Sequence, residues 1–137
     1  MIIGYKKKFP WGTETNFKRK ILEGTKLHTM REDPHDRWHA ERKIQHAHGV
    51  RTKQYDHFAD GECKSTQKVT IKYWKSFVSV YIDNDFFYNS TCRKGGIISN
   101  RMIKLIRNDG FESIEDFFRW FKVDWKGKII HFTGLKY

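Results

Sequence analysis

Three polar side chains that could act together lie close to one another in the sequence, namely Lys26, Thr29 and Arg31. A lysine whose pKa is lowered by burial and by a neighbouring cation can act as a base near neutral pH. Such a base could take the proton of the Thr29 hydroxyl, and the Arg31 guanidinium could bind a carbonyl oxygen, an oxyanion or a phosphate. The alternative is pure binding, in which Lys26 and Arg31 hold a phosphate and Thr29 only packs in a strand.

The position of Lys26 decides whether these side chains can meet. In a regular strand, Lys26 would share a face with His28. Thr29 and Arg31 would then lie on the other face. Lys26 must therefore lie on the turn that follows Gly24, before the alternation of the strand begins. With that geometry we expect Lys26, Thr29 and Arg31 to line one cleft.

The elements that would hold these residues follow from hydrophobic periodicity and turn signals. A one-sided apolar stripe predicts a helix over 14–23, which Gly24 would end. Alternation and turn residues then predict strands over 26–31 and 43–48, a turn at Asp60–Gly61, and a hairpin of 63–74 and 77–83. After a loop over 93–96, caps predict helices that begin after Ser99 and Ser113, and a closing strand follows over 128–133. This order predicts a single α+β domain over residues 1–137, built on a mixed sheet or barrel.

The net charge is the first indication of a partner. The chain carries 27 Lys and Arg against 16 Asp and Glu, a formal charge of +11. A field of this sign attracts polyanions, and nucleic acid is the commonest of them. Cations and aromatic rings alternate in the first half of the chain, and base stacking combined with phosphate contacts would use both. The residues that we expect to contact nucleic acid or another anion are Arg31, Arg37, Trp38, Arg51, Lys53 and Tyr55.

The same residues could also have roles that involve no nucleic acid. Trp38 could be a core residue that covers one end of a barrel, and the segment 51–53 could be a solvated cluster of charge. The basic face could also bind an acidic protein instead of nucleic acid.

Cysteine and histidine patterns exclude several classes of function. Cys63 and Cys92 lie 29 positions apart, which excludes a disulfide scaffold and a C-x-x-C zinc or redox site. His46 and His48 would share a strand face, but no third ligand has a suitable spacing, so we expect no metal. The segment 39–41 matches the H-x-E part of base deaminases without their P-C-x-x-C. We predict no cofactor, no membrane span and no signal peptide, and hence a cytoplasmic protein.

The segment 24–31 reads G-x-K-x-x-T-x-R and directly follows the predicted amphipathic helix. This pattern resembles the signature of the ASCH domain, a relative of the PUA RNA-binding barrel. Other segments agree with the order of the family, namely 9–12 ahead of the helix, 108–111 in a late acidic-Gly-Phe segment, and 127–132 in the closing strand. The resemblance covers almost the entire chain. In one departure, Glu41 stands where a turn with positive φ usually has Gly, so this turn would be built differently.

The resemblance implies a PUA-like mixed β-barrel with flanking helices and a cleft beside the signature. Members of the family have been linked to RNA binding, to removal of the acetyl group from acetylated cytidine, and to RNA cleavage. By resemblance to the amidohydrolase members, Asp109 takes the position of their Glu. There it would orient Lys26 or move a proton, although Asp is one methylene shorter.

The predicted function is therefore RNA or modified-nucleoside binding through a basic cleft around the signature. One alternative is a metal-independent amidohydrolase that deacetylates N(4)-acetylcytidine-type nucleosides with Lys26, Thr29 and Asp109. Another is a ribonuclease in which Lys26 acts with a His or with Tyr55. The choice between an enzyme and a binding module stays open at this point, because the fold does not fix the activity.

Overall fold

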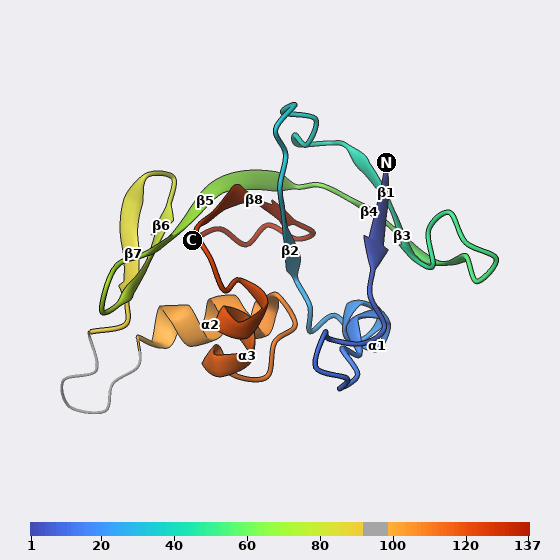
Figure 1. Cartoon of the computed structure of the whole chain (residues 1–137). Helices are drawn as coiled ribbons and strands as arrows, with labels where there is room; N and C mark the ends of the chain where they lie inside the picture. Colours follow the sequence, from blue (N-terminus) through green and yellow to red (C-terminus); the bar gives the residue numbers. More distant parts are fainter. Residues whose placement is uncertain (92–98) are drawn as a thin grey trace.

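The computed structural model describes residues 1–91 and 99–137, so Cys92 and the loop predicted over 93–96 lie outside the described residues. Within the described ranges the elements are, in chain order, β1 (Ile2–Tyr5), α1 (Phe17–Leu22), β2 (His28–Arg31), β3 (Lys43–His48), β4 (Asp56–Glu62), β5 (Ser65–Tyr73), β6 (Val78–Ile82), β7 (Asp85–Asn89), α2 (Asn100–Asn108), α3 (Ile114–Trp120) and β8 (Trp125–His131). The predicted α+β class is confirmed (Figure 1).

The strands form two sheets. In the smaller one, β1 runs parallel to β3 and β4 runs antiparallel to β3. The larger sheet is antiparallel, in the order β2–β8–β5–β6–β7. Among the described residues, the strand pairings close neither sheet into a barrel. Figure 1 shows α2 and α3 together on one side of the larger sheet, with α1 near the ends of β1 and β2.

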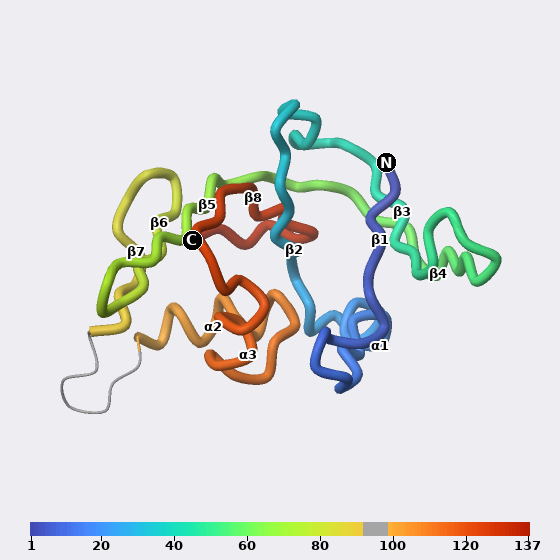
Figure 2. The backbone as a smooth tube through the Cα atoms, in the orientation of Figure 1, coloured from blue at the N-terminus to red at the C-terminus, as the bar shows by residue number. Residues whose placement is uncertain are grey.

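β8 joins the signature strand to the rest of the larger sheet. β2 lies at the edge of this sheet, and its neighbour is β8. The register pairs Thr29 with Ile130 and Arg31 with Lys128. The backbone trace in Figure 2 shows β8 between β2 and β5. Any site on β2 therefore depends on a pairing between distant parts of the chain.

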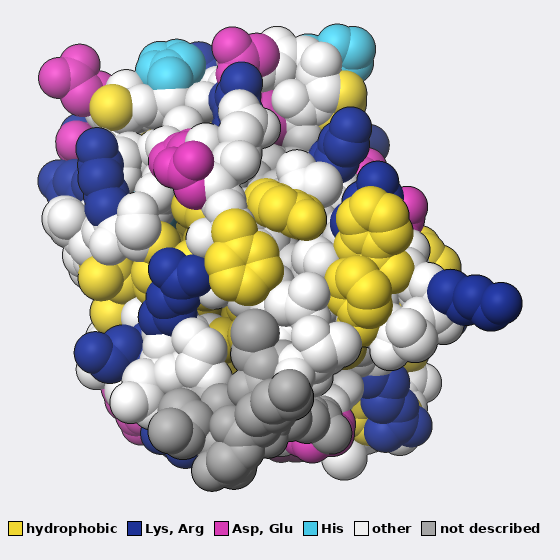
Figure 3. Space-filling view, turned by 90° about the vertical axis from the view of Figure 1, so that its left-hand side faces the viewer, with side chains coloured by type: hydrophobic (Ala, Val, Ile, Leu, Met, Phe, Trp, Pro, Cys, Tyr) yellow, Lys and Arg dark blue, Asp and Glu magenta, His cyan; other side chains and the backbone are white. Residues whose placement is uncertain are grey.

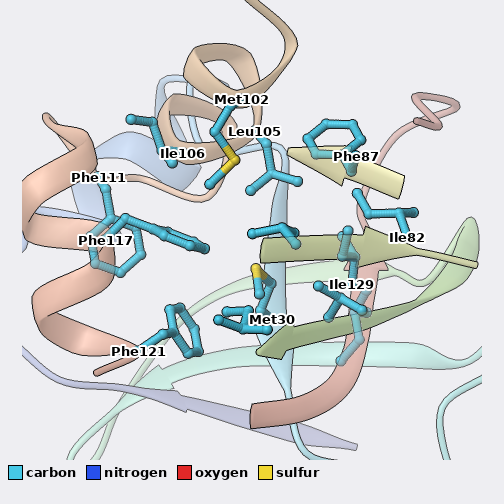
Figure 4. Packing of buried hydrophobic residues seen from close by; sticks show 14 of the residues in the cluster. Met30, Ile82, Phe87, Met102, Leu105, Ile106, Phe111, Phe117, Phe121 and Ile129 are labelled. Atoms are coloured by element: carbon cyan, nitrogen blue, oxygen red, sulfur yellow. The ribbon is translucent and has the colours of Figure 1, made fainter. Parts of the chain in front are cut away.

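The core fills the space between the helices α2 and α3 and the larger sheet. Figure 4 shows side chains of the helices and of their connection facing side chains of the strands. The labelled members of this cluster are Met30, Ile82, Phe87, Met102, Leu105, Ile106, Phe111, Phe117, Phe121 and Ile129. Burial of apolar surface is the main stabilising term in folding, so this packing holds the end of α2 firmly against the sheet.

The helix ends agree with the predicted signals in part. Ser113 caps α3, because its side chain accepts a hydrogen bond from Asp116 N at 3.1 Å. α1 is shorter than predicted and begins at Phe17. Its N-cap residue is Asn16, whose side chain makes no capping hydrogen bond. No helix in the described ranges is long and apolar enough to cross a membrane.

Two predictions about turns are wrong. Asp60–Gly61 lies inside β4, and the glycine makes room for a side chain there. A Cβ at Gly61 would lie 2.8 Å from His46 Nε2, so the histidine ring occupies that space. The turn at Glu41 has the positive φ for which this position usually has Gly, because Glu41 itself adopts a φ of 73°.

Candidate functional site

Lys26 lies in the irregular segment between α1 and β2, and not on the strand. Its backbone N–H donates to Lys20 O at 3.0 Å, so the chain is still turning at this residue. The side chain is thereby free of the strand alternation. Lys26, Thr29, Arg31 and Asp109 line one pocket of about 200 Å³, which we call the signature pocket.

Asp109 enters the signature pocket from the end of α2, where it is the C-cap residue. Its Oδ1 lies 3.6 Å from Lys26 Nζ, and Nζ also donates a hydrogen bond to the backbone oxygen of Asp109. The two side chains are only 2% and 5% exposed. Gly110 has a φ of 97°, and a Cβ there would come within 2.9 Å of the Phe17 ring. The close approach of this helix end therefore requires glycine, and it lets the short Asp side chain reach Lys26.

The surroundings of Lys26 make its amine easier to deprotonate. Burial, which is the largest influence, and the charge of Arg31 lower the pKa of Lys26, whereas Asp109 raises it. The net result is a pKa of about 8, against an ordinary value of 10.5. The amine also lies 4.7 Å from the centroid of the Phe17 ring. A lysine with this pKa can accept a proton slightly above neutral pH.

Arg31 is anchored at one side of the signature pocket. Its Nη2 donates to Gly4 O at 2.7 Å, and the guanidinium carbon lies 5.3 Å from the centroid of the Tyr5 ring. Burial raises the pKa of Tyr5, so the phenol stays neutral beside the cations. Arg31 forms no ion pair within the described ranges, so its other N–H groups can meet a carbonyl oxygen, an oxyanion or a phosphate.

Aromatic rings form much of the remaining wall. Phe17, Phe111, Trp120, Phe121 and Trp125 line the pocket beside its polar residues. The ring centroids of Phe121 and Trp125 are 4.9 Å apart, and Trp125 is only partly buried. Phe17, Phe111 and Phe121 are buried, which leaves Trp120 and Trp125 as the partly exposed rings of a kind that stacks on nucleobases. Sequence reasoning missed this wall, because no local pattern places α3 and β8 beside the signature.

Behind the pocket, a chain of hydrogen bonds runs from Asp109 to Tyr137. His28 Nδ1 lies 3.2 Å from Asp109 Oδ1, and since a carboxylate only accepts, Nδ1 carries the proton. Burial lowers the pKa of His28, so the ring is neutral and Nε2 accepts from the Tyr137 hydroxyl at 2.7 Å. Asn108 Nδ2 donates to the same hydroxyl at 3.0 Å. His28 therefore holds Oδ1 of Asp109, and Oδ2 has no partner among the described residues.

Tyr137→Phe tests this chain of hydrogen bonds. The change should cost about 1 to 3 kcal/mol of unfolding free energy, because His28 Nε2 and the Asn108 amide lose a partner in a buried place. Nitrogen NMR should still show the His28 proton on Nδ1, where the Asp109 carboxylate accepts it, but with a shifted Nε2 resonance because Nε2 has lost the hydrogen bond from Tyr137. The matched control is Tyr81→Phe, since the Tyr81 hydroxyl forms no hydrogen bond within the described ranges. Unchanged stability and an unchanged Nε2 resonance in Tyr137→Phe would contradict the network.

The other residues expected to bind nucleic acid lie away from the signature pocket. Arg37, Arg51 and Tyr55 line a second depression, and Lys53 is exposed on the same loop as Arg51. Trp38 joins neither group. It is 6% exposed and packs in the core, so its ring offers no face for a base, and a core role replaces the binding role for this residue. The structure therefore divides the predicted basic cleft into two places.

The histidines considered as metal ligands are engaged with Tyr5. His46 Nδ1 lies 2.9 Å from the Tyr5 hydroxyl, and His48 Nδ1 donates to Tyr5 O at 2.9 Å. In the part of the chain that the structure describes, no group of three or more His, Cys, Asp or Glu side chains could hold a metal ion.

Comparisons with known proteins assign no family to the chain. No family model matches it, and neither a curated protein nor a solved structure is significantly similar to it.

Proposed function

We propose that this chain is an ASCH-like domain of the PUA-like type that binds one nucleoside, free or within RNA, in the signature pocket. One observation carries the proposal: Lys26, Thr29 and Arg31 of the signature and the distant Asp109 at the end of α2 line a single pocket with an aromatic wall. The ligand would come from the cytoplasm, the compartment that the sequence favours.

The size of the pocket supports a single base as the ligand. Its volume of about 200 Å³ lies below the range of roughly 300–1,000 Å³ that drug-sized ligands fill. The partly exposed rings of Trp120 and Trp125 could stack on the face of a base. Lys26 and Arg31 could donate to its carbonyl oxygen, while Asp109 Oδ2 accepts from its amino group. A base with an amino group and a carbonyl oxygen on one edge, such as cytosine, offers this set of donors and acceptors.

Deacylation of an N-acylated cytosine is a second candidate function, and the paired Lys26 and Asp109 favour it. Water would attack the acyl carbon while neutral Lys26 Nζ takes its proton, and Arg31 would stabilise the oxyanion. The Thr29 hydroxyl would hydrogen-bond the attacking water. The proton held by Lys26 would then pass to the leaving nitrogen as the C–N bond breaks. The products would be a carboxylic acid and the free amino group of the base.

The ribonuclease alternative has less support. Tyr55 lines a different depression from Lys26. His28 is fully buried behind Asp109 and does not line the pocket. Neither residue is therefore placed to form an acid–base pair with Lys26 across a bound RNA.

Calorimetric titration with cytidine, N(4)-acetylcytidine and uridine tests the binding. We expect the wild type to bind a cytidine, and Arg31→Ala to weaken this binding about tenfold or more, since a charged hydrogen bond is lost. Arg107→Ala removes an equal charge from an exposed position on α2 and should leave the affinity unchanged. Failure of every nucleoside to bind, or equal effects of the two variants, would contradict the proposal.

Incubation with N(4)-acetylcytidine then separates a hydrolase from a binding module. If the chain deacylates it, Lys26→Met should lower the rate about 100- to 10,000-fold. The wild-type rate should rise through about pH 8, as Lys26 loses its proton. Binding without turnover would retain the binding function and remove the hydrolase.

A further inference from the structure

The depression lined by Arg37, Arg51 and Tyr55, which we call the Arg51 surface, lies apart from the signature pocket. It measures about 650 Å³ and is also lined by Ile2 and Val50. Its residues come from β1, from the segment before β3, and from the loop between β3 and β4. Figures 1 and 2 show this loop at the edge of the molecule, away from α2 and α3. The described lining residues of the two depressions do not overlap.

The Arg51 surface is positive, and its described lining includes no carboxylate. Arg37 and Arg51 supply two guanidinium groups, and no Asp or Glu is among its described lining residues. Neither guanidinium forms an ion pair within the described ranges. The signature pocket, by contrast, contains the carboxylates of Asp109 and Glu32. Unpaired arginines suit the binding of phosphate, which a guanidinium can hold through two parallel hydrogen bonds.

An exposed aromatic ring and an exposed apolar side chain lie beside these arginines. Tyr55 is 46% exposed, and Ile2 is 45% exposed. Lys53 on the same loop adds another exposed cation. An exposed tyrosine next to arginines offers a stacking face for a base whose phosphate the arginines bind.

The loop that carries Arg51 is held in shape by its own hydrogen bonds. Thr52 Oγ1 donates to Gly49 O at 2.7 Å and accepts from Gln54 N at 3.2 Å. Gly49 has a φ of 62°, and a Cβ there would lie 2.6 Å from Gln54 O, so this turn requires glycine. Arg51 has a φ of 64°, a conformation that costs a residue with a side chain about 1 to 2 kcal/mol. These contacts fix the backbone that carries Arg51, so the position of its Cα is set before a ligand binds.

Another group of exposed aromatic residues lies on the side of β6 and β7, where Figure 3 shows hydrophobic side chains near Lys and Arg. There the rings already contact other side chains, although Trp74 is 43% exposed. Lys72 Nζ lies 4.1 Å from the centroid of the Trp74 ring, and Phe77 stacks on Trp74 with centroids 5.7 Å apart. Tyr55, by contrast, makes no ring contact within the described ranges. The Arg51 surface is therefore the better place for a base to stack.

We propose that the Arg51 surface binds the sugar–phosphate backbone and one base of single-stranded RNA. This rests on the proposed function, in that the signature pocket receives a nucleoside of the same RNA. Phosphate contacts and stacking at the Arg51 surface then add to base recognition in the pocket. A nucleoside within a strand is consequently bound more tightly than the free nucleoside.

Fluorescence anisotropy with an unstructured pyrimidine RNA of about ten nucleotides tests the Arg51 surface. Arg51→Ala should weaken RNA binding about tenfold, and it should reduce the slope of log affinity against log salt concentration by about 0.7, because one phosphate contact is lost. Tyr55→Leu should weaken binding at every salt concentration without changing the slope, since stacking releases no counter-ions. Arg107→Ala is the charge control, and it should change neither quantity.

Titration with the free nucleoside separates this proposal from the proposed function. Arg51→Ala should bind the free nucleoside like the wild type. If nucleosides bind but Arg51→Ala and Tyr55→Leu bind RNA normally, the RNA site is overturned and the nucleoside pocket stands. If no nucleoside binds while RNA binding depends on Arg51 and Tyr55, the nucleoside pocket is overturned and the RNA site stands. Unchanged RNA binding with weakened binding of an acidic protein would assign the surface to that protein and overturn the proposal.

Discussion

Between about pH 8 and pH 10, the wild-type protein should gain about 2 to 3 kcal/mol of unfolding free energy from Lys26 alone. The pKa of Lys26 is about 8 in the folded protein, mainly because of burial, and 10.5 is its ordinary value in an unfolded chain. Below pH 8 both states hold the proton, and the folded state bears the full cost of the buried charge. Above pH 8 the folded state releases the proton while the unfolded state still holds it. Stability therefore rises with pH until the pH approaches 10.5.

Lys26→Met isolates this contribution, because the variant lacks the titrating amine. Cys63, Tyr5 and Tyr137 act in the opposite direction in alkaline solution, since burial raises the pKa of each and the unfolded chain loses these protons first. Their effects are present in both proteins and cancel in the difference between them. Urea unfolding across the pH range measures that difference. If it did not change with pH, Lys26 would not be the buried ammonium described here.

Asp109→Ala should destabilise the protein by about 3 to 5 kcal/mol in mildly acidic buffer, as expected when one member of a buried ion pair is removed. The change takes the carboxylate from Lys26 and leaves His28 Nδ1 without its acceptor. The loss should shrink as the pH rises toward 8. Asp109 raises the pKa of Lys26, so without it that pKa falls below about 8. In the variant, the buried Lys26 amine therefore loses its proton at a lower pH than in the wild type.

Two further variants show what part of this loss belongs to the buried pair. Asp109→Asn keeps an oxygen that can accept from His28, so it should lose less stability than Asp109→Ala. Glu112→Ala breaks the exposed ion pair with Lys20 and should cost less than about 1 kcal/mol. Thermal unfolding followed by circular dichroism compares all three. Equal losses in Asp109→Ala and Glu112→Ala would be inconsistent with a buried pair of Lys26 and Asp109.

The centre of the site could be predicted from the sequence because a local rule places it. Gly24, with a φ of 75°, follows the end of α1, so Lys26 precedes the strand and escapes its alternation. Thr29 and Arg31 share a strand face for the ordinary reason that side chains alternate. The place of Asp109 came only from the family resemblance. It depends on the packing of Gly110 against the Phe17 ring, which no local pattern encodes.

The rest of the site depends on long-range packing. In the sequence, His28 looks like an ordinary strand residue. Its hydrogen-bond partners Asp109 and Tyr137 lie 81 and 109 positions away along the chain. The four-residue strand β1 pairs in parallel with β3, a pairing that needs a long connection and leaves no turn signal between the strands. Because β1, β3 and β4 form a sheet of their own, Arg51 lines a depression that shares no described lining residue with the signature pocket. Composition suggested one basic cleft, and the sheet topology makes two.

The pairing of β2 with β8 also determines when the signature pocket can form during synthesis. β2 has β8 as its neighbour in the sheet, and β8 spans Trp125–His131. A nascent chain whose β8 is still inside the ribosome carries the signature as an unpaired strand. Assembly of the pocket therefore waits until nearly all of these 137 residues have emerged, and pairings over such distances fold slowly. A product of premature termination before β8 would contain the complete G-x-K-x-x-T-x-R segment and still lack the pocket.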